Sequence, residues 1–212
     1  MTVTAPAVVD PAPGRVEAPA SAGVPVGRAS AWCVLLAGVI GLGSAVTLLI
    51  EKIEMLINPA YVPTCSINPV LSCGSVMLTP QASVFGPPNP LFGVIGFTVV
   101  VVSGVLAVAK VALPRWYWVG LMVGTAAATV FVHWLIFQTL YRIGALCPYC
   151  MVVWAVTIPL LVVVSAIALR PLATNPVAHA LYQWRWPLVV LWFTAVLLFI
   201  LVRFWDYWST LL

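Results

Sequence analysis

Charged side chains are scarce in this sequence of 212 residues, where nine Lys and Arg and five Asp and Glu make up only 7%. Soluble globular proteins carry roughly 25% charged residues, so there are too few here to cover a water-facing surface. Hydrophobic residues make up 63%, and the mean hydropathy is +1.12. This deficit excludes a soluble domain and predicts a protein embedded in a bilayer. The net charge of +4 is modest and spread along the chain, so no nucleic-acid partner is predicted.

Five long charge-free segments each contain a stretch near the roughly 20 apolar residues that span a bilayer. Proline, glycine and the few charges divide these segments. We predict transmembrane helices over about 30–50, 91–109, 116–138, 147–169 and 186–204. The chain is therefore predicted to be an all-α integral membrane protein.

The remaining segments divide the chain into three regions. Residues 1–29 are rich in proline and offer no periodic apolar face, which predicts a disordered tail. Residues 30–170 form the predicted core, in which Asn-Pro and Pro-Pro pairs break the segment 51–90 into an exposed loop with a short helix near 74–81. Residues 171–212 hold the fifth helix and a short C-terminus.

The basic residues predict which way the helices cross. With the N-terminus inside, six Lys and Arg lie in cytoplasmic segments and three in external ones. Because basic residues favour the cytoplasmic side, we predict a multi-pass protein of the inner or plasma membrane with a cytoplasmic N-terminus. The loop 51–90 and the start of the fourth helix then lie outside the cytoplasm.

Four of the five cysteines fall on that predicted external side. Cys65 and Cys73 bracket seven residues of the loop, and Cys147 and Cys150 form a C-x-x-C at the start of the fourth helix. Four cysteines allow three pairings, but each of these two pairs has a spacing that can close locally. Disulfides persist on the oxidising side of a membrane, so two purely structural bonds are one alternative.

A C-x-x-C at a helix start favours redox chemistry. The first amides of a helix lack intrahelical partners and carry partial positive charge, which lowers the pKa of a thiol placed there. Cys147 is then predicted to be the exposed thiol, with Cys150 one turn deeper toward lipid. Because only a lipid-soluble oxidant reaches a thiol at the bilayer edge, a quinone is the predicted electron acceptor.

The order of these motifs resembles bacterial members of the vitamin K epoxide reductase family. The shared pattern is a C-x7-C loop pair, an Asn-x-x-Phe-Gly at Asn89, Phe92 and Gly93, and the run 143–150 ending in Cys-Pro-Tyr-Cys. The resemblance covers about 30–170 and implies a four-helix bundle around a quinone, menaquinone or ubiquinone, with the fifth helix outside it.

The resemblance also implies an electron relay. Cys65 would exchange with a partner dithiol, Cys73 would pass electrons to Cys147, and Cys150 would reduce the quinone. Asn89 would hydrogen-bond a quinone carbonyl, with Phe92 beside it. Trp154 stands four residues after the last cysteine, where animal members often have tyrosine, and it can stack on a ring but has no hydroxyl.

The partner and the competing function follow from the same resemblance. Many bacterial relatives carry a thioredoxin-like domain after the fifth helix, whereas this chain ends at Leu212, so a separate extracytoplasmic thioredoxin-fold oxidant is the expected partner. The function would be its reoxidation in support of disulfide bond formation. The alternative is a membrane protein that binds or transports soft metal ions through thiols. No zinc site is predicted, because the first pair lacks the usual ligand spacing.

Other residues receive structural interpretations. Cys33 and His133 are predicted to pack within helices, His133 with a hydrogen bond. Glu51, Lys52 and Glu54 are predicted to form a solvated helix end. The glycines at 93 and 96 and at 120 and 124 are predicted to allow close helix packing.

Overall fold

The computed structural model describes residues 23–170 and 176–210, with side chains from 183 onward in the second range. Most of the predicted disordered tail, 1–29, lies outside the described residues. Residues 23–27 are without regular structure, and helix α1 begins at Arg28. Helix α1 therefore begins two residues before its predicted start at about 30.

Five helices in the described ranges are long and apolar enough to cross a membrane, as predicted. A helix pairs its backbone N–H and C=O groups within itself, which is what hydrocarbon surroundings require. The spanning helices are α1 (Arg28–Ile57), α3 (Asn89–Val108), α4 (Arg115–Gln138), α5 (Pro148–Ala168) and α6 (Pro176–Arg203). The chain is a multi-pass, all-α membrane protein.

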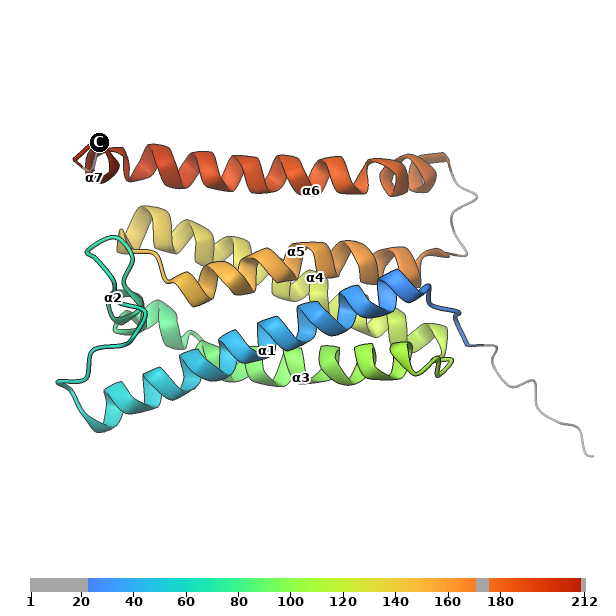
Figure 1. The fold of residues 1–212 in the computed structure, drawn as a ribbon, viewed down its shortest axis with the longest axis horizontal. Coiled ribbons are helices and arrows are strands. Elements are labelled where there is room, and N and C mark those ends of the chain that lie inside the picture. Colours follow the sequence, from blue (N-terminus) through green and yellow to red (C-terminus); the bar gives the residue numbers. More distant parts are fainter. Residues whose placement is uncertain (1–22, 171–175, 211–212) are drawn as a thin grey trace, which may run out of the picture.

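Shorter elements complete the fold, and most lie at one end of the molecule. The loop after α1 contains α2 (Cys73–Met77) and a 3-10 turn (Pro80–Ser83), close to the predicted short helix. A π-helical turn, Thr139–Ile143, extends α4. Helix α7 (Trp205–Trp208) follows α6, and Figure 1 shows it at the same end of the molecule as α2.

Four of the spanning helices form a bundle. Helix α1 packs along α3 and α5, and α5 packs along α4, whereas α6 makes sparser contact with α5 from outside (Figure 1). Proline suits the first turn of α3 and of α5, because an amide there has no intrahelical partner. This arrangement is the predicted four-helix core with a fifth helix beside it.

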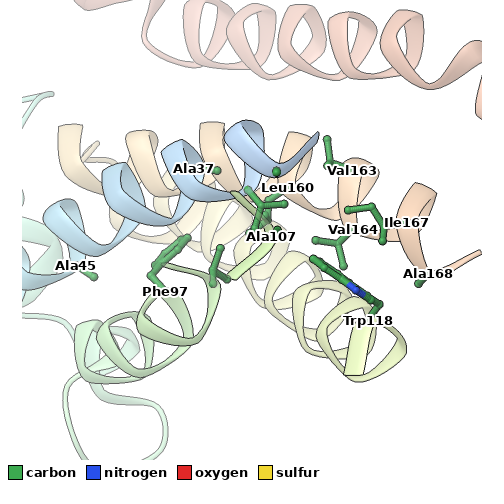
Figure 2. Packing of buried hydrophobic residues seen from close by; sticks show 13 residues of the cluster. Ala37, Ala45, Phe97, Ala107, Trp118, Leu160, Val163, Val164, Ile167 and Ala168 are labelled. Atoms are coloured by element: carbon green, nitrogen blue, oxygen red, sulfur yellow. The ribbon is translucent and has the colours of Figure 1, made fainter. Parts of the chain in front are cut away.

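The largest apolar core lies in this bundle, toward the end away from α2. Figure 2 shows the indole of Trp118 from α4 beside Val164 of α5, and the ring of Phe97 from α3 farther along the same cluster, toward Ala45. Trp118 and Val164 are fully buried. Because lipid is as apolar as these side chains, close van der Waals packing rather than exclusion from water holds the helices together.

Glycines at the contact between α1 and α3 permit this close packing. A Cβ at Gly104 would lie 2.6 Å from the Leu35 Cα, and one at Gly41 would overlap the Phe97 ring. Of the glycines predicted to serve packing, Gly93 does so, with Ala45 Cβ 3.1 Å away. The prediction is wrong for those at 96, 120 and 124, where a Cβ would meet nothing within 4 Å. Sequence spacing identified small residues but not the faces that they occupy.

We predict that Gly104→Ala destabilises the protein by about 1–3 kcal/mol, because the added methyl overpacks against the α1 backbone. The matched control is Gly120→Ala, which places the same methyl in open space. Thermal unfolding of the detergent-solubilised protein should show a lower midpoint for the first variant alone. Equal midpoints for the two variants would contradict the α1–α3 contact described above.

Candidate functional site

Three sulfur atoms meet where the loop after α1 covers the start of α5. Cys65 and Cys73 form a disulfide, whereas Cys147 and Cys150 are free thiols. The Sγ atoms of Cys73 and Cys147 lie 3.0 Å apart, and those of Cys65, Cys73 and Cys147 are all within 4.8 Å of one another. Two residues separated by 74 positions in sequence are thus placed for thiol–disulfide exchange.

A short backbone bridge between the loop and the segment before α5 brings Cys73 close to Cys147. Leu146 donates its N–H to the Val70 carbonyl at 2.7 Å and accepts at its own carbonyl from the Ser72 N–H at 2.8 Å. The pairing of Leu71 with Leu146 is parallel, and the cysteines follow directly as the next residues after Ser72 and Leu146. The bridge therefore aligns Cys73 with Cys147.

Local hydrogen bonds shape the loop that carries the bridge. The Asn68 Oδ1 accepts from the N–H groups of Val70, at 3.0 Å, and Leu71, at 2.7 Å, closing the Asn-Pro turn. The Ser66 Oγ accepts from the Gly74 N–H at 3.2 Å. Asparagine and serine are suited to such turns because their short side chains bond nearby backbone groups.

Helix α5 begins at the second pair of cysteines. Cys147 occupies the N-cap position, preceded by Gly144, whose φ of 72° ends the π-helical turn. A hydrogen bond from the Cys150 thiol lowers the pKa of Cys147, assisted by the N–H groups of Cys150 and Tyr149. These effects outweigh burial and the negative charge of Glu51, which both raise that pKa. The predicted stabilisation of a thiolate at a helix start is thereby present.

The burial of the two C-x-x-C thiols differs from the prediction. Cys147 is 1% exposed, because the loop pair lies over it, whereas Cys150 is half-buried. The expectation that Cys147 is the exposed thiol is therefore wrong. Cys65 and Cys73 are also buried, at 5% and 0%, within an apolar cluster that includes Leu48. These three sulfur atoms are therefore shielded from solvent.

The end of α1 also departs from its predicted solvated state. Glu51 is 4% exposed, and its carboxylate accepts hydrogen bonds from the Tyr61 hydroxyl at 2.9 Å and from the Thr64 N–H at 3.2 Å. Lys52 donates to the Met77 carbonyl, at the end of α2, at 2.7 Å. Lys52 is partly buried, whereas Glu54 is exposed as predicted. The sequence does not mark Glu51 as buried, because its burial depends on how the loop folds onto α1.

The residues predicted to contact a quinone do not gather in one place. Trp154 is buried and lines an apolar cavity of about 550 Å³ between α5 and α6, together with Met151 and Trp192. Asn89 and Phe92 do not line this cavity. The Asn89 amide instead donates to the Gln81 carbonyl at 2.7 Å and accepts from the Val84 N–H at 3.2 Å. Its contact with a quinone stays a prediction.

Cys33 and His133 were both predicted to have structural roles. Cys33 is half-buried and packs against the main core. His133 bonds at Nδ1 to the Thr129 carbonyl and accepts at Nε2 from the Trp192 indole, both at 2.8 Å. Because Nε2 accepts, Nδ1 carries the proton. The predicted hydrogen bond of His133 is therefore present, although its side chain is exposed, and the bond to Trp192 joins α4 to α6.

A disulfide touching a thiol at the end of a membrane helix bundle defines a class, the membrane thiol–disulfide oxidoreductases. The sequence model of the vitamin K epoxide reductase family matches residues 32–165, which include all four of these cysteines. The chain belongs to that family. No curated protein matches the sequence.

The 3.0 Å contact predicts an isolable intermediate. In Cys150→Ala, Cys147 cannot pair with residue 150, so its attack on Cys73 forms a Cys73–Cys147 bond and releases Cys65. A thiol-alkylating reagent in the mixture captures the released Cys65 and so prevents its return attack on Cys73, which lets the bond accumulate. Proteolysis followed by mass spectrometry under non-reducing conditions detects the crosslinked peptides. The double variant Cys73→Ala, Cys150→Ala is the control and should give none. A Cys65–Cys147 bond in place of the expected one would contradict the relay order.

Proposed function

We propose that the protein oxidises a dithiol carrier outside the cytoplasm and passes the electrons to a membrane quinone, supporting disulfide bond formation. The observation that carries this proposal is the meeting of the Cys65–Cys73 disulfide with the Cys147 thiol at 3.0 Å. A purely structural disulfide has no need of a reactive thiol at this distance.

The first step is exchange with the partner. One partner thiolate attacks the loop disulfide at Cys65, and its second thiol resolves the mixed disulfide, so that the partner leaves oxidised with Cys65 and Cys73 reduced. Because Cys65 is buried, the loop must be displaced for this attack. Exposed apolar side chains flank the loop pair and suit a protein partner, proposed to be a separate thioredoxin-fold oxidant: Val62, Ile67 and Leu78.

The second step is internal. The Cys73 thiolate attacks Cys147 of an oxidised Cys147–Cys150 pair, which releases Cys150 as a thiol. Cys65 then attacks Cys73, which restores the loop disulfide and frees Cys147. The structure has the bonds of this product state, with Cys65 joined to Cys73 and the C-x-x-C reduced. The lowered pKa of Cys147 makes it the better leaving group.

The cavity between α5 and α6 supports a quinone as the acceptor. Its volume of about 550 Å³ lies within the range of small-molecule sites, and its lining is apolar. Trp154 offers a face for ring stacking, and Cys150 packs against the same cluster of side chains as Trp154. A quinone bound there would accept the two electrons and two protons released when Cys147 and Cys150 join. Members of the family generally use quinones.

Soft-metal binding is the competing function. It is favoured by the three sulfur atoms within 4.8 Å of one another. However, the bond between Cys65 and Cys73 removes two of the three thiolates that such a site needs. The two functions differ in their products, since only the redox function converts quinone to quinol.

We predict that the purified protein, given menadione or a short-chain ubiquinone and a reduced thioredoxin-fold dithiol, produces quinol. Cys150→Ala should reduce the rate to background, because Cys147 can no longer form its disulfide. Cys33→Ala is the control and should keep the wild-type rate, since that thiol packs in the distant core. Quinol absorbance provides the measurement. Equal rates for wild type and Cys150→Ala would contradict the proposal.

The proposed orientation places the cysteine loop outside the cell. A cysteine introduced at Val62, which is 70% exposed in the loop, should react with an impermeant maleimide on intact cells. One introduced at Val111, in the turn between α3 and α4, should react only after permeabilisation. Labelling is measured above that of the parent protein. The reverse pattern would overturn the N-inside orientation.

A further inference from the structure

The buried end of α1 holds both ends of the cysteine loop. Glu51 accepts from Tyr61 and Thr64, and Thr64 directly precedes Cys65. The next residue, Lys52, bonds the last carbonyl of α2, the helix that begins with Cys73. Two adjacent side chains of one helix thus fix the segments that carry the two bonded cysteines.

Glu51 lies on the face of α1 that contacts the cysteine cluster. Leu48 and Met55, at helical spacing on either side of it, both pack in the apolar cluster that contains Cys65, Cys73 and Cys147. This face of α1 therefore lies against the exchange site. A carboxylate in such surroundings is costly unless it is hydrogen-bonded. The donors from Tyr61 and Thr64 compensate it, and both belong to the loop rather than to the bundle.

We infer that Glu51 is a positioning residue for thiol–disulfide exchange: its buried carboxylate fastens the segment 61–65 to α1 and so holds the Cys65–Cys73 disulfide against Cys147. The inference rests on the proposed relay, which it deepens. The loop has to open to admit a partner to Cys65, and the bonds from Tyr61 and Thr64 are those that opening breaks. Glu51 thereby favours the closed state, in which internal exchange takes place.

The charge of Glu51 has a second effect at the same site. It raises the pKa of Cys147, opposing the hydrogen bonds that lower it. Removing the charge should therefore lower that pKa and keep the thiolate populated at more acidic pH. Several other ionisable groups adjoin this cluster: Lys52, Glu54 and Tyr61 from α1 and the loop, and Tyr149 and Cys150 from α5. A pH profile needs a control for them.

Two substitutions at Glu51 separate the effect of its hydrogen bonds to the loop from the effect of its negative charge. In a Cys150→Ala background, Glu51→Ala should slow formation of the Cys73–Cys147 crosslink about ten- to a hundredfold, because the disulfide is no longer held in place. Glu51→Gln keeps the size and one acceptor oxygen, so its crosslinking should stay close to the parent's. Glu54→Gln, on an exposed position of the same helix end, is the matched control and should change neither rate nor pH profile.

The pH dependence of the rate distinguishes a positioning role from a structural one, because loss of stability alone would not shift it. With Cys150 intact, Glu51→Gln should shift the acid limb of dithiol oxidation to lower pH, with Glu54→Gln unshifted. If Glu51→Ala fails to fold, the shift of the acid limb in Glu51→Gln still tests the inference. Unchanged crosslinking in Glu51→Ala, or an unshifted limb in Glu51→Gln, would overturn the inference. The crosslinking assay contains neither quinone nor partner, so failure of the proposed function would appear separately, as absent quinol formation.

Discussion

Everything in the site depends on one backbone contact, the parallel bridge through which Leu146 bonds Val70 and Ser72. It joins a loop that follows α1 to the segment that enters α5, and it does so one residue before each of the two exchanging cysteines. Because the bonds are made by backbone groups, they fix the register without requiring particular side chains. The resulting 3.0 Å approach of Cys73 to Cys147 converts two separate cysteine pairs into a single exchange path.

The bundle supplies a rigid base for that contact. Glycines let α1 approach α3 closely, and α1 then carries Glu51 and Lys52 to the underside of the cysteine loop. Helix α5 supplies both the N-terminal amides that stabilise a thiolate at Cys147 and, deeper in the membrane, the wall that Trp154 forms at the apolar cavity. One helix thus reaches from the buried exchange site to a space suited to a lipid-soluble ring. Helix α6 closes the outer side of that space.

The sequence predicted the spans and the reactive pairs because both depend on local chemistry. Runs of apolar residues interrupted by proline and charge determine where helices cross, and cysteine spacing determines which pairs can close. The environment of Glu51, Cys147 and the glycines at 120 and 124 depends instead on how distant segments fold together, so it was predicted wrongly. The Leu71–Leu146 bridge has no side-chain signature at all, and only the Asn68-Pro69 pair predicts that the chain turns near it.

Rapid acid quenching tests the exchange path most directly. The protein is prepared with both pairs oxidised, in the absence of quinone, and mixed with one equivalent of a reduced dithiol. Differential alkylation and mass spectrometry then locate the thiols. Thiols are expected first at Cys65 and Cys73 and then at Cys147 and Cys150, as the loop disulfide re-forms. Thiols confined at all times to the loop pair, beside an intact Cys147–Cys150 bond, would contradict it.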